Sequence, residues 1–192
     1  DREHGHVQAR LHMARKVVAG HVSDKKVTTR IAHWMRAAIG WHTAQNLKLA
    51  RFGDNMRYVA VTDGDKTSAQ IALGMSIEAY GVNALVDAVA AVEESAIDTL
   101  VAEYEKLFEV SSELKKGGAR HDSLRYQASL EIALERFLEA GNFTAFTTNF
   151  EDLGALKQLP GLAVQRMMSK GYGFGGEGDW KTSALLRIIK SM

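Results

Sequence analysis

Residues 143–190 read FTAFTTNFEDLGALKQLPGLAVQRMMSKGYGFGGEGDWKTSALLRIIK and decide the fold class. Phe143–Thr148 and Tyr172–Phe174 are short runs of aromatic and β-branched residues, which is typical of strands. Leu162–Lys170 has helical spacing, and Asp179 is placed to cap a last helix. Strands that alternate with helices in this way predict a parallel sheet covered by helices on both faces.

The same alternation extends toward the N-terminus as far as Leu47. Short apolar runs indicate further strands at Leu47–Phe52, Met56–Val61 and Met75–Tyr80. Helical periodicity indicates helices from the turn at 62–65 through Leu73, at Asn83–Val92, at Ile97–Phe108 and at Asp122–Ala140. The expected fold is therefore α/β, a Rossmann-like three-layer arrangement in which helices flank a parallel sheet.

The first 46 residues predict two helices instead. In the first helix, apolar residues recur with helical spacing at Val7, Leu11, Ala14 and Val18, and Gly20 stops the run. Ser23 or Asp24 can cap the second helix. Its expected inner stripe is Val27, Ile31, Trp34 and Ala38, and Gly40 is expected to end it. Two such helices cannot enclose a core of their own, so they must pack against something else.

Charge also divides the chain near Asn46. Residues 1–46 carry eight Lys or Arg against three Asp or Glu, a net charge of +5, whereas the remainder carries 16 against 20, a net charge of −4. Six of the seven histidines also precede Asn46. We therefore expect residues 1–46 to be the helical end of a neighbouring domain and residues 47–192 to be one α/β domain.

Composition excludes several classes of protein. The 192 residues are 46% hydrophobic and 24% charged, which suits a globular domain, and they lack cysteine. A disulfide scaffold, a thiolate metal site and a cysteine nucleophile are thereby excluded. The basic residues of the first segment are scattered rather than clustered with aromatics, which argues against nucleic acid as a partner. No run is apolar enough to cross a membrane, no secretory signal opens the chain, and the cytoplasm is the expected location.

Three loops are candidates for a site, because ligands of open α/β sheets bind where strands lead into helices. They are Gly53–Met56, Thr147–Asp152 and the glycine-rich run 171–179. Gly171-x-Gly173-x-x-Gly176 satisfies a dinucleotide-binding pattern, but Glu177 and Asp179 would repel a pyrophosphate. The alternative is a carboxylate site, in which Glu177 binds a divalent cation or transfers protons. A purely structural role for Glu177 beside the helix dipole remains open at this point.

Other suggestive residues have simpler interpretations. His4, His6 and His12 lack a standard metal-ligand spacing and are better explained as surface or subunit-contact residues. By default the core takes the large apolar side chains near these loops, namely Met56, Phe146, Phe150 and Trp180.

Four blocks of sequence, in the right order, resemble L-arabinose isomerases. The longest is residues 159–192, LPGLAVQRMMSKGYGFGGEGDWKTSALLRIIKSM. The others are Arg51-Phe-Gly-Asp-Asn-Met-Arg57, Val61-Thr-Asp-Gly-Asp-Lys66 and Ala145-Phe-Thr-Thr-Asn-Phe-Glu-Asp-Leu153. The resemblance spans the whole chain and is weakest over Glu93–Ser123. It implies that the chain is an internal segment, the closing helices of an N-terminal domain followed by most of a central domain.

This resemblance implies an aldose–ketose isomerase that interconverts L-arabinose and L-ribulose and also accepts D-galactose, giving D-tagatose. It implies manganese as cofactor, one ion per active site, with Glu177 both a metal ligand and a catalytic carboxylate. Met56, Thr147 and Phe150 would line the sugar pocket. A homo-oligomer is implied as well, with a hexamer as the expected state.

The chemistry implied is proton transfer through an enediol(ate), with a metal that polarises the carbonyl and carboxylates that act as acid and base. The resemblance places a second glutamate and two histidines of the metal site beyond Met192, and a pocket histidine before Asp1. We therefore expect this segment alone to be inactive. Two alternatives remain, a sugar-binding module without catalysis and an assembly role for residues 1–46.

Overall fold

The computed structural model describes residues 2–192 and contains one parallel sheet. Its strands are β1 (Lys48–Phe52), β2 (Ser76–Tyr80), β3 (Ala145–Thr148) and β4 (Gly173–Gly175). They lie in the order β2-β1-β3-β4, and every pair is parallel. The expected α/β class and parallel sheet are confirmed.

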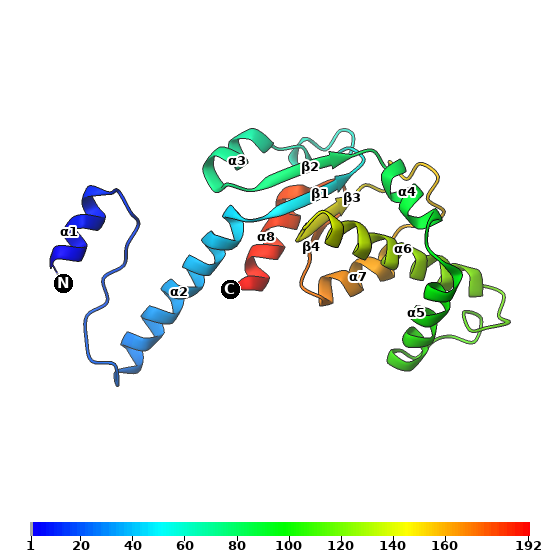
Figure 1. Ribbon diagram of the computed structural model, residues 1–192, viewed down its shortest axis with the longest axis horizontal. Coiled ribbons are helices and arrows are strands. Elements are labelled where there is room, and N and C mark those ends of the chain that lie inside the picture. The colour runs from blue at the N-terminus through cyan, green and yellow to red at the C-terminus, as the bar shows by residue number, and fades with distance from the viewer. Residues whose placement is uncertain (1) are drawn as a thin grey trace.

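Helices cover both faces of this sheet (Figure 1). The helices are α1 (Arg2–Arg10), α2 (Lys25–Gln45), α3 (Lys66–Leu73), α4 (Asn83–Ala90), α5 (Glu94–Leu107), α6 (His121–Ala140), α7 (Gly161–Ser169) and α8 (Trp180–Ser191). On one face Leu49 and Ala145 pack with residues of α2, α3 and α8. On the other face Phe52 and Phe146 pack with residues of α4 to α7. The three-layer arrangement is confirmed.

Aspartates cap three helices, and for Asp24 and Asp179 the sequence predicts this role. Asp24, Asp65 and Asp179 each accept a hydrogen bond from a backbone N–H in the first turn of α2, α3 and α8, respectively. Such bonds satisfy donors that a helix start otherwise leaves unpaired. No described helix is long and apolar enough to span a bilayer.

Both predicted ends of the N-terminal helices are wrong. The first helix ends at Arg10 rather than near Gly20, because its residues bury nothing and a short helix without a packing partner is marginal. The second continues through Gly40 to Gln45. Gly40 is buried, and a Cβ built on it would lie 2.8 Å from Met192 Sδ, so close packing on the end of α8 outweighs the weak helix propensity of glycine.

The strand expected at Met56–Val61 does not form. This segment is a turn followed by the 3-10 helix η1 (Ala60–Thr62). Both edges of β1 already pair with strands, with β2 on one side and β3 on the other. The backbone N–H of Met56 instead donates to the carbonyl of Glu177, 2.9 Å away.

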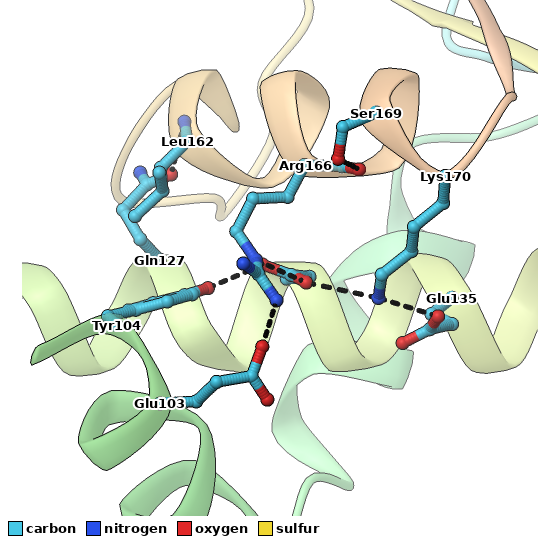
Figure 2. A network of polar contacts seen from close by, with 9 residues as sticks. Glu103, Tyr104, Gln127, Glu135, Leu162, Arg166, Ser169 and Lys170 are labelled. Carbon is cyan, nitrogen blue, oxygen red and sulfur yellow. Dashed lines mark hydrogen bonds and ion pairs between the residues drawn. The ribbon is translucent and has the colours of Figure 1, made fainter. Parts of the chain in front are cut away.

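A buried ionic network joins α5, α6 and α7 on the sheet face of Phe52 and Phe146 (Figure 2). Glu131 on α6 is fully buried. Its carboxylate accepts hydrogen bonds from Tyr104 Oη of α5 at 2.6 Å, from Arg166 Nε of α7 at 2.7 Å and from Lys170 Nζ at 3.2 Å. One carboxylate thus ties three helices together, and α7 leads directly into β4.

Two outer carboxylates complete this network. Glu103 accepts from Arg166 at 2.6 Å and Glu135 accepts from Lys170 at 2.7 Å. Burial disfavours the charged Lys170, but its bonds to Glu135 and Glu131 outweigh that effect and raise its pKa. Burial and the bond to Glu131 raise the pKa of Tyr104 as well. Both groups therefore stay protonated at neutral pH.

Candidate functional site

The candidate site lies at the carboxyl edge of the sheet, where loops follow β1, β3 and β4. The neighbouring strands β1 and β3 connect in opposite directions across the sheet. The chain runs from β1 to β2 on one side and from β3 to β4 on the other side. Connections that run in opposite directions from neighbouring strands open a crevice, and ligands of α/β proteins bind there. Residues 53–56, 149–152 and 176–179 of the three predicted loops meet at this edge, because all four strands are parallel. Gly171 and Tyr172 of the glycine-rich run precede β4 and lie at the other end of the strands.

Glu177 lies on the loop between β4 and α8 and is exposed to solvent. Its φ is +65°, in the left-handed region that residues with a Cβ rarely adopt. The loop is fixed by its backbone. The carbonyl of Glu177 accepts from Met56 N at 2.9 Å, and Gly178 N donates to the carbonyl of Thr148 at 3.0 Å. A strained residue held by its neighbours is typical of functional sites.

Gly178 allows the loops after β1 and β4 to touch. Its φ is +74°, and a Cβ at this position would lie 2.6 Å from both the Asp54 carbonyl oxygen and the Asn55 Cα. These are backbone atoms, so a side chain at position 178 would push the two loops apart.

We expect Gly178→Ala to destabilise the domain. The left-handed backbone costs about 1–2 kcal/mol for a residue with a Cβ, and the overpacking adds about 1–3 kcal/mol. Urea unfolding followed by circular dichroism measures the loss. Gly176→Ala is the matched control, because a Cβ there meets no atom within 4 Å. Equal stability of the two variants would contradict the packing described.

Met56 and Phe150 lie on the loops that follow β1 and β3, and the backbone of both loops or of the strand before them bonds to residues 177–178. Met56 is half-buried and bonded through its backbone to Glu177. Phe150, two residues beyond the end of β3, is 48% exposed. Neither is a core side chain, which corrects the default expectation for these two residues. Phe146 and Trp180 do belong to the core.

Two family models match the chain. The model of the L-arabinose isomerase central domain matches residues 48–192, and that of the N-terminal domain matches residues 1–46. The chain belongs to the L-arabinose isomerase family. Its sequence is 58% identical to the L-arabinose isomerase of Clavibacter sepedonicus and 59% identical to that of Arthrobacter sp. (strain FB24). It is 54% identical to that of Geobacillus kaustophilus (strain HTA426).

These identities extend over all 192 residues of the chain but cover only part of each relative. The chain spans 38% of the length of the Clavibacter and Arthrobacter relatives and 39% of that of the Geobacillus relative. The rest of the L-arabinose isomerase polypeptide therefore has no counterpart in the residues described.

Thr147 is placed differently from the other predicted sugar contacts. It is fully buried in β3, and its hydroxyl donates to the Gly175 carbonyl at 2.6 Å. In this structure the side chain of Thr147 therefore joins β3 to β4 directly behind the Glu177 loop. Its contact with a sugar stays a prediction.

Sequence reasoning placed the loops but missed the contacts of their polar residues at this edge. The Asn149 side chain donates to the Asp54 carbonyl at 3.1 Å, and the Asp152 carboxylate accepts from Asp54 N at 3.3 Å. Glu151 accepts from Arg57 N at 2.8 Å. The signal was present, because these polar residues lie within five positions of the ends of β1 and β3. Their pairing across about a hundred residues could not be read from local patterns.

The helix start beside Glu177 does not suit a pyrophosphate. The Asp179 carboxylate accepts from the backbone N–H groups of Lys181 and Thr182, which a bound phosphate would need. The dinucleotide interpretation of Gly171–Gly176 is therefore not supported by the structure.

A complete manganese site is not formed by the described residues. Within 2–192 no group of three or more His, Asp or Glu side chains is arranged to hold a metal ion. Glu177 has the hard carboxylate oxygens that manganese accepts, but one residue does not supply the several donors such an ion requires. The residues present do not by themselves fit the cofactor that the family resemblance implies.

Proposed function

We propose that this chain forms part of an aldose–ketose isomerase that interconverts L-arabinose and L-ribulose, and D-galactose and D-tagatose. Membership of the L-arabinose isomerase family supports the reaction class. The observation that carries the proposal is the exposed Glu177 at the carboxyl edge of the sheet, on a loop whose backbone at residues 177–178 bonds to Met56 and Thr148.

The proposed role of Glu177 is to move a proton between neighbouring sugar carbons. An aldose becomes a ketose when the hydrogen on C2 is transferred to C1 and the hydroxyl proton on O2 passes to O1. A carboxylate beside these carbons can remove the first proton to give an enediolate and can return a proton to the neighbouring carbon. Its position on a short, constrained loop suits this task, because proton transfer requires a fixed geometry.

The neighbouring side chains would receive the sugar. Met56 and Phe150 offer apolar surface to the carbon skeleton, which is the usual complement to the polar contacts of a sugar site. Manganese remains part of the proposal, with Glu177 as one ligand and the others from parts of the enzyme outside residues 2–192. The described chain alone is then expected to be inactive.

Conversion of L-arabinose deuterated at C2 tests the reaction. The complete enzyme should form L-ribulose and release part of the deuterium to water, because a proton held by a carboxylate exchanges with solvent. Complete retention of deuterium in the product would contradict proton transfer by an exchangeable acid. The chain of residues 1–192 alone should form no ketose.

We also infer an assembly role for α2, as in a homo-oligomer such as a hexamer. Of its expected inner stripe only Val27 is buried, whereas Ile31, Trp34 and Ala38 are exposed. Trp41 is 50% exposed on the same helix. A groove of about 610 Å³ between α2 and residues 13–14 is lined by Trp34 and Trp41. Contiguous apolar surface of this kind marks an interaction site. The partner proposed for it is a second copy of the chain.

Trp34→Glu should therefore lower the oligomeric mass of the complete enzyme, because a carboxylate would be buried without a partner in the contact. Sedimentation velocity measures the mass. Ile71→Glu on α3 is the control, since Ile71 is 82% exposed and outside the α2 surface. An unchanged mass with unaltered circular dichroism would show that Trp34 packs only within its own subunit.

A further inference from the structure

Arg51 is a buried cation whose position is not explained by stability. It lies on β1, next to the carboxyl end of the strand, and is 8% exposed. Its Nη2 lies 3.1 Å from Asp54 Oδ1. Its Nε and Nη1 are buried and have no hydrogen-bond acceptor among the described residues. A buried guanidinium with unpaired donors costs folding free energy.

The partner of Arg51 is the centre of the turn after β1. The Asp54 carboxylate, which Arg51 contacts, also accepts from Asn55 N at 2.9 Å. The Asp54 backbone is held by Asp152 through its N–H and by Asn149 through its carbonyl. Asp54 is thus fixed from the strand below it and from the loop that follows β3.

The turn at residues 53–56 also holds the backbone of Glu177. The Asp54 carbonyl oxygen and the Asn55 Cα lie 2.6 Å from where a Cβ on Gly178 would be, so the turn packs directly on the backbone next to Glu177. The next residue of the turn, Met56, donates its N–H to the Glu177 carbonyl. A shift of the turn would move Glu177 through both contacts.

We propose that Arg51 is a positioning residue of the Glu177 site. Its ion pair with Asp54 holds the turn 53–56 against residues 177–178 and so sets where the Glu177 carboxylate lies. Arg51 acts through Asp54 and does not touch the sugar. This inference rests on the proposed isomerase function, and it explains a buried charge that the fold itself does not require.

Arg51→Met in the complete enzyme tests this role, because methionine fills similar apolar space and has no donors to leave unpaired. We expect kcat for L-ribulose formation to fall about 10- to 100-fold, since small misplacements of catalytic groups have effects of this size. KM should change little, and the melting temperature should be unchanged or higher. Arg51→Lys, which keeps the charge near Asp54, should restore part of kcat.

Arg187→Met is the matched control. Arg187 on α8 is also partly buried with an unpaired Nε, but its Nη1 donates to the Gly171 carbonyl, which precedes β4 at the opposite edge of the sheet. Its loss should leave kcat unchanged. An Arg51→Met enzyme with the wild-type kcat, or with kcat and melting temperature falling together, would overturn the inference. An inactive wild-type enzyme would instead overturn the proposed function.

Discussion

Glu177→Gln should lower kcat for L-ribulose formation in the complete enzyme by about 100- to 10,000-fold, the range that a positioned acid or base contributes. Glutamine keeps the shape of the side chain but neither accepts nor donates the transferred proton. It also removes the negative charge offered to a divalent cation. Initial rates of ketose formation at saturating L-arabinose measure the loss.

The left-handed backbone at Glu177 allows function to be separated from stability. Glu177→Gly and Glu177→Ala both remove the carboxylate, but only glycine relieves the φ of +65°. We expect the glycine variant to be more stable than the alanine variant by about 1 kcal/mol in urea unfolding, because glycine adopts this region without a Cβ clash. Both should be as inactive as Glu177→Gln. An active alanine variant would show that Glu177 is not the catalytic carboxylate.

Arg166→Met should produce the largest loss of stability. It removes the closest cation from the fully buried Glu131 and leaves that carboxylate with Tyr104 and Lys170 alone. Breaking one partner of a buried ion pair costs about 3–5 kcal/mol. Urea unfolding of the chain, followed by far-ultraviolet circular dichroism, measures the difference.

The double variant Glu131→Leu with Arg166→Met is its control. Replacing both partners by apolar residues leaves no unpaired buried charge, because Lys170 keeps its bond to Glu135 and only the neutral Tyr104 hydroxyl loses its acceptor. Such replacements are often neutral. The double variant should therefore be more stable than Arg166→Met alone. If the double variant is the less stable of the two, the contacts of Glu131 and Arg166 stabilise the fold by more than the free energy cost of desolvating their charges. The account given for Glu131 is then wrong.

The same network predicts loss of stability in alkali. The pKa of Tyr104 is raised above its usual 10.0 and that of Lys170 above its usual 10.5. Above these ordinary values the unfolded chain releases protons that the folded chain retains, so the free energy of unfolding falls as pH rises. Unfolding midpoints measured from pH 8 to 11 should fall above pH 10. Tyr104→Phe should reduce the slope.

Local signals in the sequence identified the α/β elements well. Asp65 and Asp179 begin helices because a short carboxylate before a helix satisfies its first N–H groups wherever it occurs. Prediction failed where tertiary packing determines the secondary structure. Gly40 continues a helix because Met192 lies against it, and Met56–Val61 is no strand because both edges of β1 are taken. The packing partner of Gly40 and the strands that pair with β1 are all distant in sequence.

The candidate site shows the same division. The glycines around Glu177, and the loops that follow strands, predict a site at this edge of the sheet from local sequence alone. The left-handed φ of Glu177 and the ion pair of Arg51 with Asp54 depend on how loops from three strands meet. The local sign of that arrangement in the sequence is an arginine near the end of an otherwise apolar strand.

Ketose formation from L-arabinose by the complete enzyme, with manganese added and with manganese removed by a chelator, tests the central claim most directly. The account predicts L-ribulose in the presence of the metal, a large loss after chelation, and none from residues 1–192 alone under either condition. A folded, manganese-loaded complete enzyme that forms no ketose, or a chain of residues 1–192 that forms it unaided, would contradict the account.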